Sequence, residues 1–93
     1  MASFTTRVEL HGADWSDYEN LHQKMAAQGF SRIITAGDGK RYWLPPAEYN
    51  YEAAATRPEV LAKAKAAASQ VKRSFAVFVT EACGRTWYGL EAA

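Results

Sequence analysis

The first segment of the chain alternates between two kinds of position. In residues 4–11 (FTTRVELH), Phe4, Thr6, Val8 and Leu10 occupy one set of alternate positions, and polar side chains occupy the other. A period of two is that of a strand with one buried face. We therefore predict a strand over residues 4–11.

The pattern then changes to a helical period. Four side chains fall on one helical stripe: Tyr18, Leu21, His22 and Met25. Ser16 and Glu19 have the spacing of a capping box, and Gly29 can take the left-handed conformation that ends many helices. These signals predict a helix over residues 16–28.

Two strands and a tight turn follow. Residues 30–35 and 40–44 are rich in β-branched and aromatic side chains, and the glycines in 36–39 (AGDG) allow a hairpin turn between them. Pro45 and Pro46 cannot donate a backbone hydrogen bond, so the second arm ends there or lies at an edge. A hairpin is therefore predicted over residues 30–44.

The second half of the chain repeats the order of strand and helix. Alternation resumes in residues 47–53, with Tyr49 and Tyr51 on one face, and this predicts a further strand. Thr56 and Glu59 again have capping-box spacing. The apolar stripe of the predicted second helix comprises Val60, Leu61, Ala64, Ala67, Ala68 and Val71.

The C-terminal quarter adds the last predicted strands. Residues 74–82 (SFAVFVTEA) are apolar on both faces, which is typical of a central strand covered by helices or by a partner subunit. Residues 85–90 (RTWYGL) predict a short final strand. The whole order is that of a split βαβ unit, the ferredoxin-like α+β plait, with an antiparallel sheet, two helices on one face and an extra hairpin arm.

Composition limits what such a domain can do. The 93 residues suit one domain, residues 1–93. The formal net charge of +1 indicates neither a nucleic-acid-binding protein nor one with an acidic surface. Cys83 is the single cysteine, so thiols cannot build a zinc site, and no pattern indicates a cofactor. We expect a cytoplasmic protein that does not enter a membrane, because neither a signal segment nor a long apolar run is present.

Two histidines are the candidates for acid–base chemistry. His11 ends the first predicted strand beside Glu9, and an imidazole near a carboxylate can bind a metal or act as general base in phosphodiester cleavage. A solvated strand end explains the same residues, since no metal-ligand spacing accompanies them. His22 lies on an apolar stripe, where a partly buried, hydrogen-bonded histidine is the simpler interpretation.

The hairpin carries the residues that could bind a nucleic acid. Arg32, Lys40 and Arg41 supply positive charge, and Tyr42 and Trp43 supply surfaces on which bases stack, so the hairpin could hold single-stranded RNA. An ordinary amphipathic hairpin would have the same composition. Residues 72–79 (KRSFAVFV) lack the glycines and flanking aromatics of the RNA-recognition motif, which excludes that particular family.

Aromatic residues outside the hairpin suggest a second use for the domain. Tyr49 and Tyr51, together with Trp87 and Tyr88, could cover the open face of the sheet in a homodimer. So much exposed aromatic surface would be unusual on a 93-residue monomer. We therefore expect a homodimer. The alternative to RNA binding is a non-catalytic module whose open sheet face serves only dimerisation or a protein partner.

One segment resembles a known family. Residues 21–53 (LHQKMAAQGFSRIITAGDGKRYWLPPAEYNYEA) are similar in order and spacing to the GhoS family, the endoribonuclease antitoxins of type V toxin–antitoxin systems. The shared features are a helix that ends in a small residue and Phe-Ser, a short strand, an acidic-Gly turn, a Leu-containing break and an aromatic strand. The resemblance extends more weakly over residues 4–80.

The resemblance implies a function. It implies a ferredoxin-like fold related to the CRISPR-associated Cas2 proteins, and cleavage of a toxin's messenger RNA. Those proteins place an aspartate at the end of the first strand, whereas this chain ends that strand with His11, so no metal ligand is carried over. The residues to test are His11 or His22 as the base for attack by a 2′-hydroxyl, and Arg7 or Arg32 as the cation that stabilises the phosphate.

Overall fold

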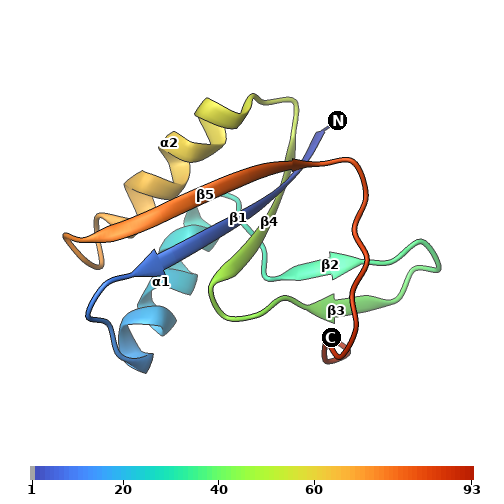
Figure 1. Cartoon of the computed structure of the whole chain (residues 1–93), viewed down its shortest axis with the longest axis horizontal. Coiled ribbons are helices and arrows are strands. Elements are labelled where there is room, and N and C mark those ends of the chain that lie inside the picture. The colour runs from blue at the N-terminus through green and yellow to red at the C-terminus, as the bar shows by residue number, and fades with distance from the viewer. Residues whose placement is uncertain (1) are drawn as a thin grey trace.

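The computed structural model describes residues 2–93 (Figure 1). They form an α+β domain with two helices, a three-stranded sheet and a separate two-stranded sheet. The elements in chain order are β1 (Ala2–Leu10), α1 (Trp15–Ala27), β2 (Ile33–Thr35), β3 (Arg41–Trp43), β4 (Glu48–Ala53), α2 (Arg57–Ala68) and β5 (Phe75–Ala82).

The larger sheet is antiparallel, with the strand order β4-β1-β5. The first strand therefore lies in the middle, and its Thr6 pairs with Tyr49 on one side and with Val79 on the other. Phe4, Thr6, Val8 and Leu10 are buried, so the prediction of one buried face is confirmed. Both helices pack on that face and share one core with the sheet.

The two tyrosines of β4 belong to this core. Tyr49 is buried, and Tyr51 packs against the core at a ring distance of 4.8 Å from Phe30. The expectation that they lie on the open face of the sheet is therefore wrong. Alternation correctly placed them on one face, but it does not say which of the two faces the helices cover.

Helix α1 begins with a different capping box from the predicted one. Asp14 is the N-cap residue, and its carboxylate accepts a hydrogen bond from the Asp17 N–H at 3.0 Å, while the Asp17 carboxylate accepts one from the Asp14 N–H at 3.1 Å. The prediction of a Ser16–Glu19 box is wrong because the helix starts earlier; Ser16 instead donates to Asp14.

The end of α1 and the start of α2 follow the sequence signals. Gly29 has a φ of 94°, and the Phe30 N–H donates to the Met25 carbonyl at 3.1 Å, which is the hydrogen bond of a Schellman motif. At α2 the predicted Thr56–Glu59 capping box is confirmed, with reciprocal hydrogen bonds of 2.9 and 3.4 Å. Both helices are therefore fixed locally.

Strand β5 is an edge strand and not the predicted central one. Its Val77 and Val79 are half-buried beneath α2, but Phe78 points to the opposite face and is 70% exposed. The apolar pattern on both faces does not reflect coverage on both faces within this chain. Only the helix side of β5 is covered.

A C-terminal strap, residues 83–93, connects the two sheets (Figure 1). Arg85 donates to the Thr5 hydroxyl and to the Asn50 side-chain carbonyl, each at 2.9 Å. Further along, the Trp43 N–H donates to the Glu91 carbonyl and Ala92 bridges to Tyr42. The predicted strand over residues 85–90 does not form, because these residues cross between the sheets and include Gly89 at a φ of 82°.

Candidate nucleic-acid interface

Helix α1 and strand β4 bring His22 against Tyr49. The His22 Nδ1 lies 2.6 Å from the Tyr49 hydroxyl, and the two rings meet edge to face. The other ring nitrogen, Nε2, is buried and has no hydrogen-bond partner among residues 2–93. His22 is therefore partly buried and hydrogen-bonded, as the simpler interpretation of its helical stripe predicts.

Burial and charge both keep the His22 ring neutral. Desolvation lowers its pKa below the ordinary value of 6.5, and the positive charge of nearby Arg32 lowers it further, while Glu19 acts weakly in the other direction. Burial raises the pKa of the Tyr49 hydroxyl, which therefore stays protonated. This hydroxyl can donate to Nδ1, and that hydrogen bond assigns the imidazole proton to Nε2.

Arg32 lies between this pair and the hairpin. Its guanidinium carbon is 5.5 Å from the centre of the Trp43 ring, within the range of a cation–π interaction. Its Nε is buried and without a hydrogen-bond partner in the described part of the chain. Arg32 thus combines a stacked guanidinium with a donor that the domain itself does not satisfy.

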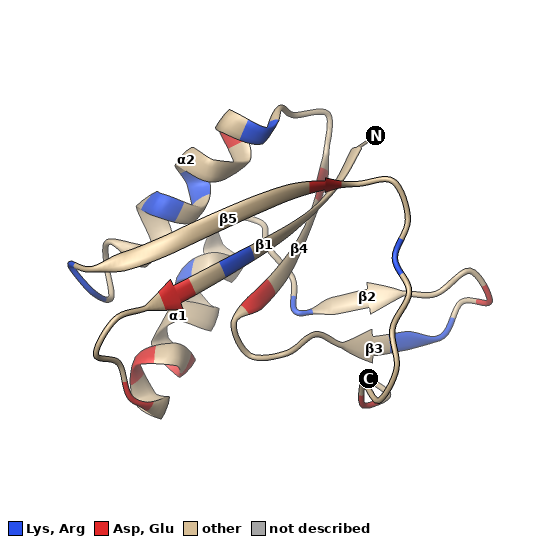
Figure 2. Cartoon of the chain, in the orientation of Figure 1, with Lys and Arg blue, Asp and Glu red and all other residues tan. Residues whose placement is uncertain are grey.

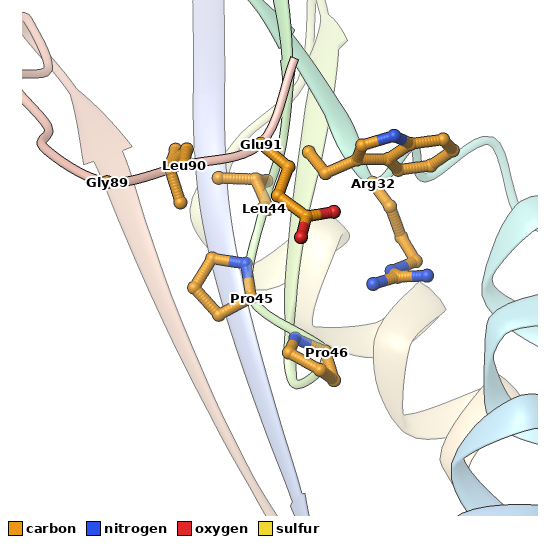
Figure 3. Close-up of a pocket in the computed structure, with 8 residues that line it drawn as sticks. Arg32, Leu44, Pro45, Pro46, Gly89, Leu90 and Glu91 are labelled. Atoms are coloured by element: carbon orange, nitrogen blue, oxygen red, sulfur yellow. The ribbon is translucent and has the colours of Figure 1, made fainter. Parts of the chain in front are cut away.

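A cavity of about 480 Å³ opens beside Arg32 and Trp43. Pro45 and Pro46 form one wall, and the C-terminal strap forms the other (Figure 3). The Arg32 guanidinium and the Glu91 carboxylate both project toward this space in Figure 3. The cavity can therefore receive a group that offers hydrogen-bond acceptors to Arg32 and apolar surface to the prolines.

The hairpin presents most of the predicted RNA-binding residues on one face. Trp43 pairs with Ile33 and Arg41 with Thr35, so Arg41 and Trp43 project to the same side of β3, and both are exposed. Lys40 is exposed in the turn beside them. Tyr42 points the other way and packs on Trp87 at a ring distance of 5.5 Å, so it is not available on that face.

Figure 2 shows how charge is distributed around this hairpin. Basic residues lie at the start of β2 and at the start of β3, and an acidic residue lies in the turn between the two strands. Arg32 directly precedes β2, and Lys40 and Arg41 lie at the start of β3. Asp38 is in the turn, where it accepts a hydrogen bond from the Lys40 N–H at 3.0 Å. A chain of phosphates could follow the basic positions past the exposed indole.

The other two proposed catalytic residues lie elsewhere. Arg7 is on the open face of β1 and forms an ion pair of 3.5 Å with Glu48. His11 follows β1, is exposed, and contacts the Ser74 hydroxyl at 2.7 Å and Glu9 at 3.8 Å. The structure thus brings His22 and Arg32 together, and it places Arg7 and His11 on the other side of the sheet.

Three contributors to this region were not predicted from the sequence. Tyr49 supplies the hydroxyl that contacts His22, Glu91 lines the cavity, and Arg85 holds the strap that forms one cavity wall. Each acts across a long stretch of chain, and no local pattern signals such a contact. The expectation that Tyr49 lies on the open face of the sheet also directed attention away from its contact with His22.

Comparisons with known proteins give no information on this site. No family model, curated protein or solved structure matches the chain. Across the described part of the chain, no three His, Cys, Asp or Glu side chains gather as a metal site would require. Neither helix within residues 2–93 is long and apolar enough to cross a membrane.

Proposed function

We propose that the protein binds single-stranded RNA along the face of the β2–β3 hairpin that carries Arg41 and Trp43. The observation that carries the proposal is the Arg32 guanidinium stacked 5.5 Å from the exposed Trp43 ring, beside an open cavity. An exposed indole accepts a base by stacking, and adjacent cations hold the phosphates on either side. Arg41 shares the face with Trp43 and supplies the second cation.

The sequence resemblance adds a family to this proposal, a cytoplasmic protein of the GhoS type that acts on a toxin's messenger RNA, and the topology supports the ferredoxin-like fold that the resemblance implies. The order β4-β1-β5 matches three strands of a ferredoxin-like plait, whose fourth strand would lie beside β4. Ser31 and Asn50 exchange two backbone hydrogen bonds, 2.8 and 2.6 Å, at that position. Strand β3 would then be the extra arm of the plait.

The geometry supports binding more directly than cleavage. His22 lies near Arg32, but neither of its ring nitrogens is open to a substrate. His11 is exposed, but it follows the end of β1 that lies farther from the hairpin in Figure 1. Cleavage by attack of a 2′-hydroxyl is therefore a second part of the proposal, to be tested on the same RNA.

The binding test uses one variant that removes charge from the hairpin and one that removes its stacking surface. We expect an Arg32→Gln/Arg41→Gln variant to lose affinity for a labelled mixed-sequence RNA and to show a weaker salt dependence, because phosphate contacts release counterions. Removing the stacking surface by Trp43→Ala should cost about 1–3 kcal/mol of binding free energy. Fluorescence anisotropy at several salt concentrations measures both effects.

The control for this test lies on α2. An Arg57→Gln/Lys63→Gln variant removes the same charge from exposed positions away from the hairpin and should bind as the wild type does. Equal loss in both variants would show that only net charge matters and would contradict a hairpin site. Gel analysis of the same RNA with magnesium and with EDTA tests cleavage, with an Arg7/His22/Arg32 triple-alanine variant as the inactive reference.

A second function, a protein-interaction module without catalytic activity, is favoured by one separate observation. Phe78 is 70% exposed on a strand at the edge of the sheet. An exposed phenylalanine at a sheet edge contributes nothing to the hairpin site. Intact RNA and absent binding in every assay above would make this the leading function.

A further inference from the structure

The outer edge of β5 carries backbone groups that are free to pair. The His11 N–H donates to the Ser74 carbonyl at 3.0 Å, so residue 74 and every second residue after it direct their backbone groups toward β1. The intervening residues direct their N–H and C=O groups outward: Phe75, Val77, Val79 and Glu81. None of these four has a backbone partner beyond β1 within residues 2–93.

This edge lacks the features that usually protect a sheet edge. The segment Phe75–Ala82 contains no proline and no lysine, and its pairing with β1 runs without a bulge from Leu10 to Ser3. Proteins commonly use such features to prevent an exposed edge from pairing with another chain. A long, regular, mostly apolar edge is therefore suited to a partner strand.

The charges at the two ends of β5 favour an antiparallel copy of the same strand. Arg73 precedes β5 and Glu81 lies near its end, and neither forms an ion pair within the described residues. Antiparallel pairing of two copies places the basic end of each strand beside the acidic end of the other, whereas parallel pairing places like charges together. The complementarity thus selects both the partner and the direction.

We propose that two copies of the chain associate through β5, with Phe78 facing Phe78 of the partner subunit across a two-fold axis. This register lets all four outward-facing residues form hydrogen bonds, since Val77 pairs with Val79 of the partner subunit and Phe75 pairs with Glu81 of the partner subunit. The two three-stranded sheets then form one continuous six-stranded sheet. Any other register leaves part of the edge unpaired.

The side chains next to the edge fit this arrangement. On the open face, the exposed Phe78 rings meet in an aromatic cross-strand pair. On the helix face, a groove beside β5 is lined by Pro58 and Leu61 of α2 together with Val77 and Val79, and the partner strand would cover it. Both faces thus bury apolar surface that is exposed in the single chain.

This inference is independent of RNA binding. The hairpin connects to the sheet on the β4 side, and β5 is at the opposite edge, so a dimer through β5 leaves the hairpin open (Figure 1). A failure of either proposal therefore leaves the other untouched. Anisotropy with RNA reports on the hairpin, and the mass of the free protein reports on β5.

The first test uses charge at the two-fold axis. Light scattering after size exclusion should give twice the chain mass of 10.3 kDa for the wild type. Phe78→Glu places two like charges opposite each other and should raise the dissociation constant of the dimer by more than about tenfold. Phe78→Lys should do the same, and mixing the two variants should restore the double mass.

Two results would overturn the proposal. One is a wild type that keeps the mass of a single chain at the highest concentration that stays soluble. The other is a dimer that persists equally in the Phe78→Glu variant, since this would place the interface elsewhere. Because Phe78 is mostly exposed, both variants should fold, and circular dichroism identical to that of the wild type checks this.

The second test fixes the register. In a Cys83→Ser background, Phe78→Cys should form a disulfide-linked dimer under mild oxidation, because opposed residues at such a position have Cα atoms about 4.5 Å apart. Thr80→Cys faces Ala76 of the partner subunit and lies about 13 Å from its own copy, so it should crosslink poorly. Stronger crosslinking through Thr80→Cys would overturn the proposed register.

Discussion

At the scale of single residues, the partly buried His22 ring makes stability depend on pH. The folded state lowers the pKa of His22 from 6.5, so below that pH the unfolded chain binds more protons than the folded one. The contribution of neutral His22 to stability is therefore fully present above about pH 6.5, and it is lost as the pH falls from there through the lowered pKa. We expect His22→Gln to remove this part of the decline, as measured by urea unfolding between neutral and mildly acidic pH. Parallel curves for the two proteins would contradict the assignment.

The contacts of single residues were predictable from the sequence only where the partner lies nearby in the chain. Thr56 and Glu59 form the predicted capping box because both ends of each hydrogen bond lie within one helical turn. The partner of His22 is Tyr49, which comes from another element, so the stripe predicted burial but not the hydrogen bond. The same limit applies to Arg32, whose stacking on Trp43 depends on the hairpin geometry, and to Arg7, whose ion-pair partner Glu48 lies on the neighbouring strand β4.

At the scale of elements, the position of each strand in the sheet decides what its apolar residues contribute. Phe4 is fully buried in the central strand β1, and Phe78 is mostly exposed on the edge strand β5. We expect Phe4→Ala to lower the free energy of unfolding by about 3–5 kcal/mol. In the monomer, Phe78→Ala should cost less than about 1 kcal/mol, as an exposed substitution usually does. Chemical unfolding of dilute protein measures both, and equal losses would place β5 inside the sheet.

Most elements could be predicted from the sequence because their patterns are periodic. Alternation located β1 and β4, and caps and stripes located both helices with small shifts at their ends. Residues 74–82 were correctly predicted as a strand, but an apolar pattern cannot distinguish coverage by this chain from coverage by another. Their edge position follows from the order of the strands, which periodicity does not encode.

At the scale of the whole molecule, the strap holds the hairpin and the sheet together. Arg85 donates from two guanidinium nitrogens to Thr5 on β1 and Asn50 on β4, and Asn50 is also the residue that bridges to Ser31 before the hairpin. We expect Arg85→Ala to cost about 1–3 kcal/mol, because it removes two charge-assisted hydrogen bonds. Arg85→Lys should recover only part of this loss, since an ammonium group cannot match the planar fork.

Denaturant midpoints of the three proteins measure this effect. Full recovery by lysine would show that charge alone anchors the strap. The sequence did not reveal the strap, because residues 85–90 resemble a strand in composition, while the hydrogen-bond partners of the whole strap, residues 83–93, lie in β1, β3 and β4. The cavity wall that contains Glu91 was unpredictable for the same reason.

The central place of β1 also governs how the domain reaches its native state. Thr6 finds its two partners, Tyr49 and Val79, only in the second half of the chain, so the sheet cannot form before long loops close. Proteins dominated by such distant pairings fold on the order of milliseconds to seconds, more slowly than helical domains of equal length. Helices α1 and α2, which carry their own caps, would form transiently much earlier and become stable only when they pack on the sheet. We therefore expect the pairing of β1 with β4 and β5 to limit the folding rate.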